Sequence, residues 1–79
     1  MSANRDLAAI FDQIASALEL LGANPFRANA HRRVARAVRD LPRDVAELVA
    51  ADPRTAAARL EAIPGIGRSS AEKILEYLD

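Results

Sequence analysis

The sequence predicts an all-α, compact domain of four to five short helices, and three observations support this prediction. Apolar residues recur at three- and four-residue intervals, which is the spacing of helices with one buried face. No stretch shows the two-residue alternation that is typical of a half-buried strand. The 79 residues are 51% hydrophobic but only 4% aromatic, so the small core must consist mainly of aliphatic side chains.

Turn signals separate the predicted helices. Gly22 is a natural stop for the first helix, and Asn24-Pro25 can both turn the chain and start the second. Pro42 suits the beginning of a third helix, and Asp52-Pro53 repeats the combination of a cap and a proline. The expected helices span residues 4–21, 25–41, 43–51, 53–62 and 68–78.

The apolar face of each helix predicts the core. The side chains expected to be buried are Leu7, Phe11, Ile14, Leu18, Val34, Val38, Leu48, Leu60, Ile63, Ile74 and Leu78. Leu21 continues the stripe of the first helix, and Ala30 continues that of the second. We therefore expect both of them to face the core as well.

Positive charge is concentrated in one segment. The chain has a net charge of +0, yet residues 25–43 carry six arginines against one aspartate. A neutral chain does not suit a protein that coats nucleic acid, whereas a basic segment can hold phosphate locally. Arg32, Arg36, Arg39 and Arg43 recur on one face of the second helix and predict an exposed stripe. This stripe is either a phosphate-binding surface or an ordinary solvated face.

Composition excludes several other kinds of site. The chain has no cysteine, so it has neither a disulfide framework nor a thiolate metal site. Its single histidine, His31, cannot form a zinc site alone. Neither a signal peptide nor a membrane span is evident in the sequence. We therefore expect a cytoplasmic monomer with no membrane partner.

The most specific stretch runs from Leu60 to Tyr77 and reads LEAIPGIGRSSAEKILEY. A helical pattern ends at Ile63, the turn Pro-Gly-Ile-Gly follows, and a second helical pattern begins. The two glycines suit a hairpin whose backbone needs positive φ or close approach by a ligand, and Ile66 between them would plug the turn onto the core. Because the turn opens a helix, its N–H groups lie at a positive dipole end that favours a phosphate.

This arrangement resembles the helix-hairpin-helix motif, which binds DNA backbones without reading bases. The match includes Ile63, the PGIG turn, Ala71 and Ile74. An ordinary corner between two helices with a glycine-rich turn is the alternative. The resemblance implies sequence-independent DNA contacts from the turn and the following residues, namely Pro64, Gly65, Ile66, Gly67, Arg68, Ser69 and Ser70.

Nearly the whole chain is similar to the N-terminal eight-kilodalton domain of family X DNA polymerases, especially their bacterial branch. The similarity rests on Asn24-Pro25-Phe26-Arg27, on the basic run from Arg32 to Arg36 leading to Leu41-Pro42, and on the stretch from Ile63 to Ile74. In that family the domain holds the 5′-phosphate side of gapped DNA during base excision or gap-filling repair. In the beta polymerase and some relatives it also removes a 5′-deoxyribose phosphate as a lyase. The resemblance implies that the chain is a fragment of a longer polymerase.

Carried over by position, the lyase nucleophile is Lys73, and the 5′-phosphate pocket consists of Arg27, His31 and Ser69. Arg27 keeps the charge of the family's lysine, and His31 replaces a tyrosine. Ser69 replaces a second lysine and loses its charge, so we expect weaker phosphate binding. Arg32, which follows His31, is included in the predicted DNA-binding surface.

The spacing of these residues is compatible with one pocket. Ser69 and Lys73 lie one turn apart on the last helix, and Arg27 and His31 lie one turn apart on the second. Helical side chains lean toward the N-terminus, so Lys73 leans toward the hairpin. If the two helices pack with these faces together, the four residues form a small polar pocket that contains one amine.

The resemblance also implies that carbonyl oxygens of the hairpin can coordinate a monovalent cation, Na⁺ or K⁺, which bridges to a DNA phosphate. By position these are the carbonyls of Glu61, Ile63 and Ile66. We expect the domain to require no other cofactor.

Three functions remain open. The chain is a sequence-independent DNA-binding module, or the same fold acting as a 5′-deoxyribose phosphate lyase through a Schiff base on Lys73, or a helical protein-interaction domain. For Lys73 the plain alternative is a surface lysine paired with Glu76, three residues further along the helix. Polymerase activity is not expected in this segment, because no cluster of acidic residues in a strand context could hold two metal ions.

Overall fold

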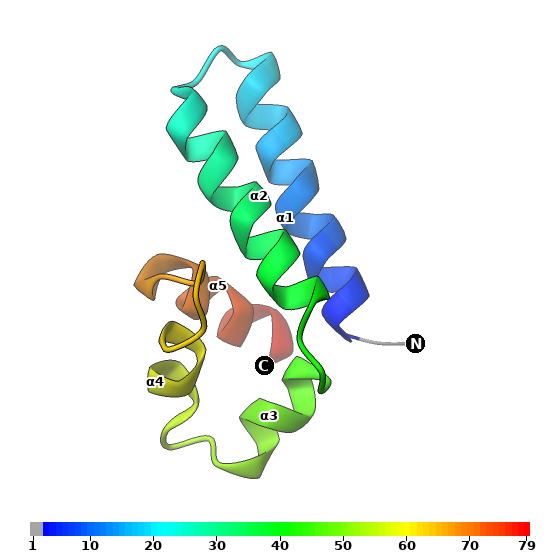
Figure 1. Cartoon of the computed structure of the whole chain (residues 1–79), viewed down its shortest axis with the longest axis vertical. Helices are drawn as coiled ribbons and strands as arrows, with labels where there is room; N and C mark the ends of the chain where they lie inside the picture. The colour runs from blue at the N-terminus through cyan, green and yellow to red at the C-terminus, as the bar shows by residue number, and fades with distance from the viewer. Residues whose placement is uncertain (1–2) are drawn as a thin grey trace.

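A computed structural model describes residues 3–79 (Figure 1). It contains five helices, α1 (Ala3–Leu20), α2 (Pro25–Arg39), α3 (Val45–Ala51), α4 (Ala56–Glu61) and α5 (Arg68–Leu78). No strand occurs in this range, so the predicted all-α fold is confirmed. Within the same range, none of the helices combines the length and the apolar character needed to cross a bilayer.

Helices α1 and α2 form a long antiparallel pair, and α3, α4 and α5 pack against one end of it (Figure 1). The molecule measures 39 × 25 × 20 Å. Helix α2 begins where the sequence predicts, because the side chain of Asn24 accepts a hydrogen bond from the N–H of Phe26 at 2.8 Å and Pro25 occupies the first turn. The α1–α2 pair supports the three short helices at one of its ends (Figure 1).

The core lies where the short helices meet the α1–α2 pair. Its buried side chains are Leu7, Ala8, Phe11, Val34, Ala35, Val38, Val45, Leu60, Ile66, Ala71 and Ile74. Of the side chains predicted to be buried, the half-buried ones are Ile14, Leu18, Leu48, Ile63 and Leu78. The prediction is thus correct at the centre of the core, but it overestimates the burial of side chains at the edges.

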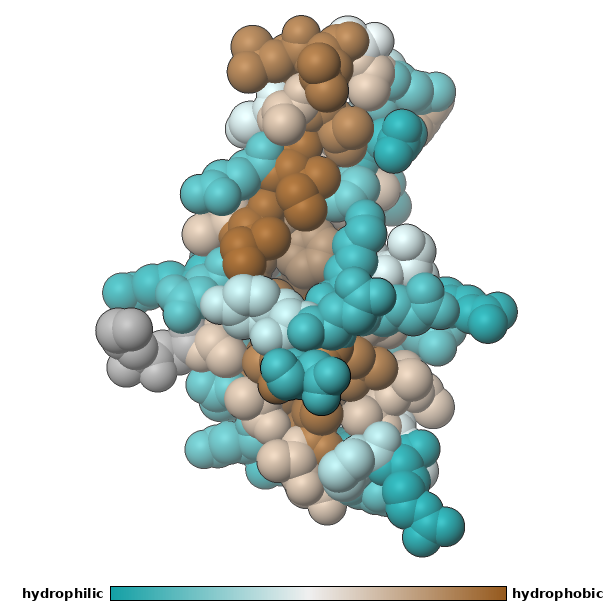
Figure 2. Space-filling model, turned by 180° about the vertical axis from the view of Figure 1, so that it is seen from behind, coloured by the Kyte–Doolittle hydropathy of each residue, from teal (hydrophilic) through white to brown (hydrophobic). Residues whose placement is uncertain are grey.

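The free tip of the α1–α2 pair departs from the predicted core. Leu21 is 82% exposed, and Ala30 is exposed as well. Leu20 and Phe26, at 90% and 77% exposure, belong to the same tip, where Figure 2 shows hydrophobic surface. The reason is geometric, since α3, α4 and α5 cover only the opposite end of the pair and no third layer reaches the tip.

Two helix boundaries near Pro42 differ from the prediction. Helix α2 ends at Arg39 rather than at residue 41, because a residue that precedes proline avoids the α conformation. Helix α3 begins at Val45 rather than at residue 43. Its cap is Asp44, whose Oδ1 accepts a hydrogen bond from the N–H of Ala46 at 2.8 Å.

The Asp52-Pro53 signal produces a turn instead of a helix start. The N–H of Arg54 donates to Oδ1 of Asp52 at 3.2 Å, and the N–H of Thr55 donates to its carbonyl oxygen at 3.2 Å. Helix α4 therefore begins at Ala56 and is shorter than the expected span of 53–62. The expected and observed bounds of α5 coincide at 68–78.

A buried polar residue ties α1 to the start of α3. Asn4 is 8% exposed, its Nδ2 donates to the carbonyl oxygen of Arg43 at 2.8 Å, and its Oδ1 accepts from the N–H of Val45 at 2.7 Å. Oδ2 of Asp44 accepts a further hydrogen bond from the N–H of Ala3 at 3.1 Å. Because a buried amide is costly unless it is hydrogen-bonded, these contacts fix the register of the short helices against α1.

Candidate nucleic-acid interface

The hairpin between α4 and α5 packs closely against the middle of α2 at Gly65. This residue has a φ of +95°, a conformation that residues with a side chain rarely adopt. A Cβ atom there would lie 3.4 Å from the carbonyl oxygen of Arg33 and 3.5 Å from Cβ of Ala37. The positive φ therefore favours glycine at this position, and a Cβ there would make an ordinary van der Waals contact with α2.

Ile66 anchors the same turn to the core. Its N–H donates to the carbonyl oxygen of Ile63 at 3.0 Å, which closes the turn, and its side chain is only 3% exposed. The predicted plug is confirmed. The hairpin is thus held at two adjacent points, at Gly65 by α2 and at Ile66 by the core.

Gly67 plays a different part from Gly65. It caps α5 with a φ of −92° and a ψ of −177°, and nothing lies within 4 Å of the Cβ that a larger residue would have there. The turn itself therefore does not require this glycine. Of the two reasons that the sequence suggests for the paired glycines, positive φ does not apply to Gly67, and close approach by a ligand stays a prediction.

The first turn of α5 presents backbone donors at this open position. The N–H of Ala71 is bonded to the carbonyl oxygen of Gly67 at 2.9 Å, so the N–H groups of Arg68, Ser69 and Ser70 precede the first bonded amide. Gly67, Arg68 and Ser69 are exposed. The arrangement suits an anion, because the donors and the positive end of the helix dipole act together.

The predicted exposed arginine stripe is divided in the structure. Arg32 is ion-paired with Glu19, and Nη2 of Arg39 lies 2.8 Å from Oδ2 of Asp12. Both acids belong to α1, which runs alongside this edge of α2. Arg39 is nevertheless exposed, as predicted, whereas Arg32 is half-buried. The two ion pairs were not predicted, because the neighbouring helix supplies carboxylates that a single-helix projection cannot show.

A basic groove on the outer face of α2 remains open. It is lined by Asn29, Arg32, Arg33 and Arg36. Within the described part of the chain, neither Arg33 nor Arg36 makes an ion pair. The backbone of Arg33 also adjoins the hairpin at Gly65. The sequence pattern places Arg36 in the predicted stripe but misses Arg33, since the docking of the hairpin on α2 is a long-range contact. The signal for Arg33 was its membership of the basic run that ends at Arg36.

The structure brings His31 and Lys73 together. Nζ of Lys73 lies 3.4 Å from Nε2 of His31, which connects α5 to α2. Nδ1 of His31 lies 2.7 Å from the carbonyl oxygen of Arg27, and the imidazole ring is 6.1 Å from the ring of Phe11. Among residues 3–79 Lys73 makes no ion pair with Glu76, which was the plain alternative for this lysine.

The other two residues of the predicted pocket lie on either side of this contact. Arg27 is one turn before His31 on α2, and Ser69 is one turn before Lys73 on α5; both are exposed. In the range that the structure describes, the guanidinium of Arg27 and the hydroxyl of Ser69 make no hydrogen bond. Their polar groups are therefore available to a ligand.

The family model of the helix-hairpin-helix domain matches residues 2–79. The chain belongs to this family. No curated protein and no solved structure matches it. Helix-hairpin-helix domains typically bind DNA, and in this helix-hairpin-helix domain the hairpin opens directly onto the exposed start of α5.

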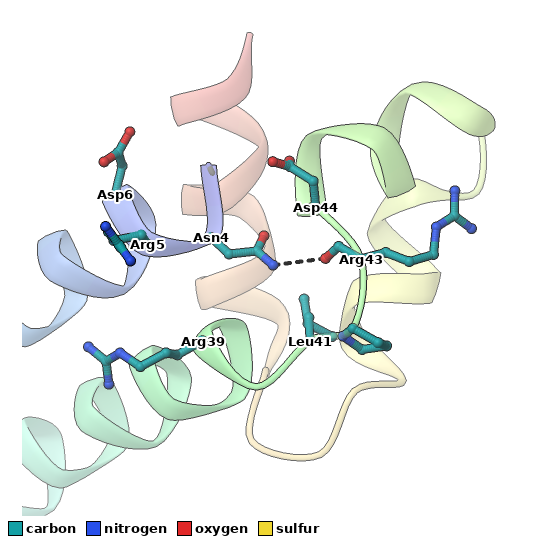
Figure 3. A pocket seen from close by; sticks show the side chains of 8 residues that line it. Asn4, Arg5, Asp6, Arg39, Leu41, Arg43 and Asp44 are labelled. Carbon is teal, nitrogen blue, oxygen red and sulfur yellow. Dashed lines mark hydrogen bonds between the residues drawn. The ribbon is translucent and has the colours of Figure 1, made fainter. Parts of the chain in front are cut away.

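A second hollow of the helix-hairpin-helix domain lies between the start of α1 and the loop after α2 (Figure 3). Its lining includes three arginines and two aspartates, namely Arg5, Arg39, Arg43, Asp6 and Asp44. The guanidinium of Arg43 points away from the other two (Figure 3). The hollow contains none of the predicted site residues, and its hydrogen bonds hold α1 to the loop.

The three carbonyls predicted to hold a cation belong to α4 and the hairpin of the domain. The carbonyl oxygen of Ile63 accepts the N–H of Ile66, which uses one of its two lone pairs. Carbonyl oxygens are suitable ligands for monovalent cations. The carbonyl oxygens of Glu61, Ile63 and Ile66 are therefore chemically suitable ligands for such an ion. The described residues contain no group of three or more histidine, cysteine, aspartate or glutamate side chains that could hold a metal ion.

Proposed function

We propose that this helix-hairpin-helix domain binds DNA through its backbone and holds the 5′-phosphate side of gapped DNA for a family X DNA polymerase. The observation that carries the proposal is the open start of α5, where Gly67 leaves space in front of backbone donors that Gly65 and Ile66 hold in place. Contacts of backbone N–H groups to phosphate do not depend on the base sequence.

The basic groove of α2 supports the same function. Arg33 and Arg36 add two positive charges on the helix against which the hairpin packs. A DNA strand whose phosphate occupies the start of α5 has further phosphates at its neighbouring nucleotides, and these arginines are the nearest unpaired cations of α2 that the groove offers. Such contacts strengthen binding in a salt-dependent manner.

The preference for a terminal 5′ phosphate rests on the pocket residues. Arg27 and Lys73 supply charged donors from two helices, His31 contacts the amine of Lys73, and Ser69 supplies a hydroxyl beside the first turn of α5. A terminal phosphate carries more negative charge than an internal one and benefits more from such donors. Because Ser69 stands where the family has a lysine, we expect a modest preference.

A monovalent cation at the hairpin is part of this proposal. The carbonyls of Glu61, Ile63 and Ile66 would hold Na⁺ or K⁺, and the ion would supply positive charge to a phosphate. The domain's own contribution is to keep the three carbonyls in the closed turn at Ile66.

Binding to a one-nucleotide gap tests the main proposal. Wild-type protein and the Gly67→Val variant are titrated with gapped duplexes of unrelated sequences, and Arg54→Ala, an exposed arginine on the turn before α4, serves as the control. We expect the Gly67 variant to bind weakly to every duplex and the control to bind like the wild type. Equal binding by all three proteins would remove the hairpin from the DNA-binding surface.

A second candidate function is a 5′-deoxyribose phosphate lyase. The contact between Lys73 and His31 favours it, because it places the only lysine of the chain in the pocket beside a group that can accept a proton. Borohydride trapping on DNA with an incised abasic site tests this candidate. A covalent adduct would identify a Schiff base.

A further inference from the structure

We infer that His31 is the proton acceptor that prepares Lys73 for attack on an aldehyde. The inference rests on the lyase candidate for Lys73 and assigns a catalytic role to a residue that the family resemblance places only in the phosphate pocket. It concerns the two groups whose nitrogen atoms lie 3.4 Å apart, Nζ of Lys73 and Nε2 of His31.

The hydrogen bonds of His31 determine which ring nitrogen carries the proton. A carbonyl oxygen only accepts hydrogen bonds, so Nδ1 must donate its N–H to the carbonyl oxygen of Arg27 at 2.7 Å. In a neutral imidazole the other nitrogen, Nε2, then has a free lone pair. An ammonium group only donates, and the contact with Nζ of Lys73 therefore runs from Lys73 to His31.

The ring is held in the orientation that this role requires. The bond to the carbonyl oxygen of Arg27 fixes the ring at one end, and the ring of Phe11 lies at a centroid distance of 6.1 Å on the core side. His31 is half-buried, so its remaining polar atom is directed at Lys73. Residues that are held by packing and by a second hydrogen bond lose little entropy when they act on a neighbouring group.

No carboxylate competes for the amine of Lys73 in the described part of the chain. The neighbouring acid Glu72 is paired with Arg68 at 3.6 Å, and Glu76 makes no ion pair with Lys73. A carboxylate partner would hold the lysine in its charged form, which is not nucleophilic. His31 instead offers Nε2 as a hydrogen-bond acceptor.

The proposed reaction begins with a proton transfer between the two residues. The ammonium of Lys73 transfers one proton to Nε2 of His31, which leaves a neutral amine and an imidazolium. The amine attacks C1 of the ring-opened deoxyribose, forming a C–N bond while the carbonyl becomes a hydroxyl group. The imidazolium returns its proton to that hydroxyl, which leaves as water, and a protonated Schiff base remains. Solvent water then accepts a proton from C2, the C3–O bond breaks, and the phosphate of the downstream strand leaves with the electron pair of that bond.

The arrangement is compatible with the substrate class that the family resemblance implies, a sugar aldehyde that carries a 5′ phosphate. The amine requires an aldehyde, and the donors of Arg27 and of the first turn of α5 require a phosphate on the same molecule. A sugar aldehyde that carries a 5′ phosphate has both groups. An aldehyde without a phosphate is a poorer substrate.

Three variants separate a proton acceptor from a structural residue. His31→Gln keeps a hydrogen-bond acceptor for Lys73 but cannot take up its proton, whereas His31→Phe keeps a ring beside Phe11 and has no nitrogen. His31→Ala leaves room for added imidazole. Each variant is first checked for helical content and cooperative unfolding, and its affinity for gapped DNA is measured in the same buffer.

The readout is the rate of borohydride trapping on a DNA strand with an incised abasic site, with the N-terminal amine acetylated. Lys73 is the only lysine, so peptide mass spectrometry assigns the adduct without ambiguity. We expect His31→Gln and His31→Phe to trap about 100-fold more slowly, which is the usual size of a general-base contribution. Added imidazole is expected to restore trapping in His31→Ala and to leave Lys73→Arg inactive.

Two results would overturn the inference, and they differ from a failure of DNA binding. If His31→Gln traps at the wild-type rate, His31 is not the proton acceptor, although Lys73 remains the nucleophile. If the wild type binds gapped DNA but forms no adduct, both the lyase candidate and the role of His31 are wrong, while the DNA-binding proposal stands. If the wild type does not bind gapped DNA, that result contradicts both the proposed function and the inference.

Discussion

Gly65 of the hairpin packs against α2, where a Cβ atom would lie 3.4 Å from the carbonyl oxygen of Arg33. This contact links the hairpin to the basic helix. It also separates the two glycines of the turn into a structural residue, Gly65, and a residue that faces open space, Gly67. The difference makes it feasible to disturb the interface without disturbing the fold.

Gly65→Ala is expected to destabilise the domain. The residue has a φ of +95°, a conformation that residues with a side chain rarely adopt, so alanine there is strained. Strain of this kind costs about 1–3 kcal/mol. Chemical denaturation followed by circular dichroism measures the effect, with Gly67→Ala as the matched control, which we expect to change stability by less than about 0.5 kcal/mol. Equal stability of the two variants would contradict the distinction between the glycines.

Gly67→Val is expected to weaken DNA binding while the fold stays intact. The residue has an extended backbone, so a β-branched side chain is accepted there, but the side chain fills the space in front of the α5 amides. Losing one charge-assisted hydrogen bond costs about 1.5–3 kcal/mol, so we expect the Kd to rise roughly tenfold or more. Fluorescence anisotropy with gapped duplexes of several sequences measures this change. A rise confined to one sequence would argue against contacts to the backbone.

Arg33→Ala and Arg36→Ala are expected to reduce the salt dependence of DNA binding. Each arginine that neutralises a phosphate contributes about 0.9 to the slope of log K against log salt concentration. Both side chains line the open groove of α2, in contrast to Arg39, which is tied to Asp12. Titrations at several salt concentrations give the slope, with Arg54→Ala as the control. An unchanged slope in both groove variants would place the DNA away from α2.

DNA with a 5′ phosphate is expected to bind more tightly than DNA with a 5′ hydroxyl. The extra charge is met by Arg27 and by Lys73, which His31 contacts, whereas the uncharged Ser69 keeps the difference to a few-fold, or about 1 kcal/mol. Arg27→Ala is expected to abolish the preference, and Ser69→Lys is expected to increase it. Competition experiments with the two ends at low salt measure it. Equal affinity for both ends in the wild type would remove this pocket from the binding surface.

Lys73→Arg is expected to retain much of the DNA affinity and to lose nearly all borohydride trapping. Arginine keeps the positive charge but cannot present a neutral amine at ordinary pH. Lys73→Ala is expected to lose trapping together with some affinity. Because the N-terminal amine is a rival nucleophile, the measurement uses acetylated protein. Trapping that persists in acetylated Lys73→Arg would exclude Lys73 as the nucleophile.

The sequence by itself determined the features that depend on neighbouring residues. The helical periodicity, the start of α2 at Asn24-Pro25 and the plug formed by Ile66 were all predictable, because caps, turns and amphipathic faces are local properties. The bounds of α5 coincide with the expected ones for the same reason. The predicted start of the fourth helix at Asp52-Pro53 was wrong, because a local hydrogen bond to Asp52 closes a turn before α4 begins.

Only the tertiary structure decided how these elements meet. Leu21 fits the apolar stripe of α1 but is exposed, because the short helices do not reach the tip of the α1–α2 pair. Arg39 fits the exposed stripe of α2 but is paired with Asp12 of α1. The approach of Lys73 to His31 joins residues 42 positions apart in the chain. A periodic pattern describes one helix at a time, whereas burial, ion pairing and the assembly of a site depend on which faces of two helices come into contact.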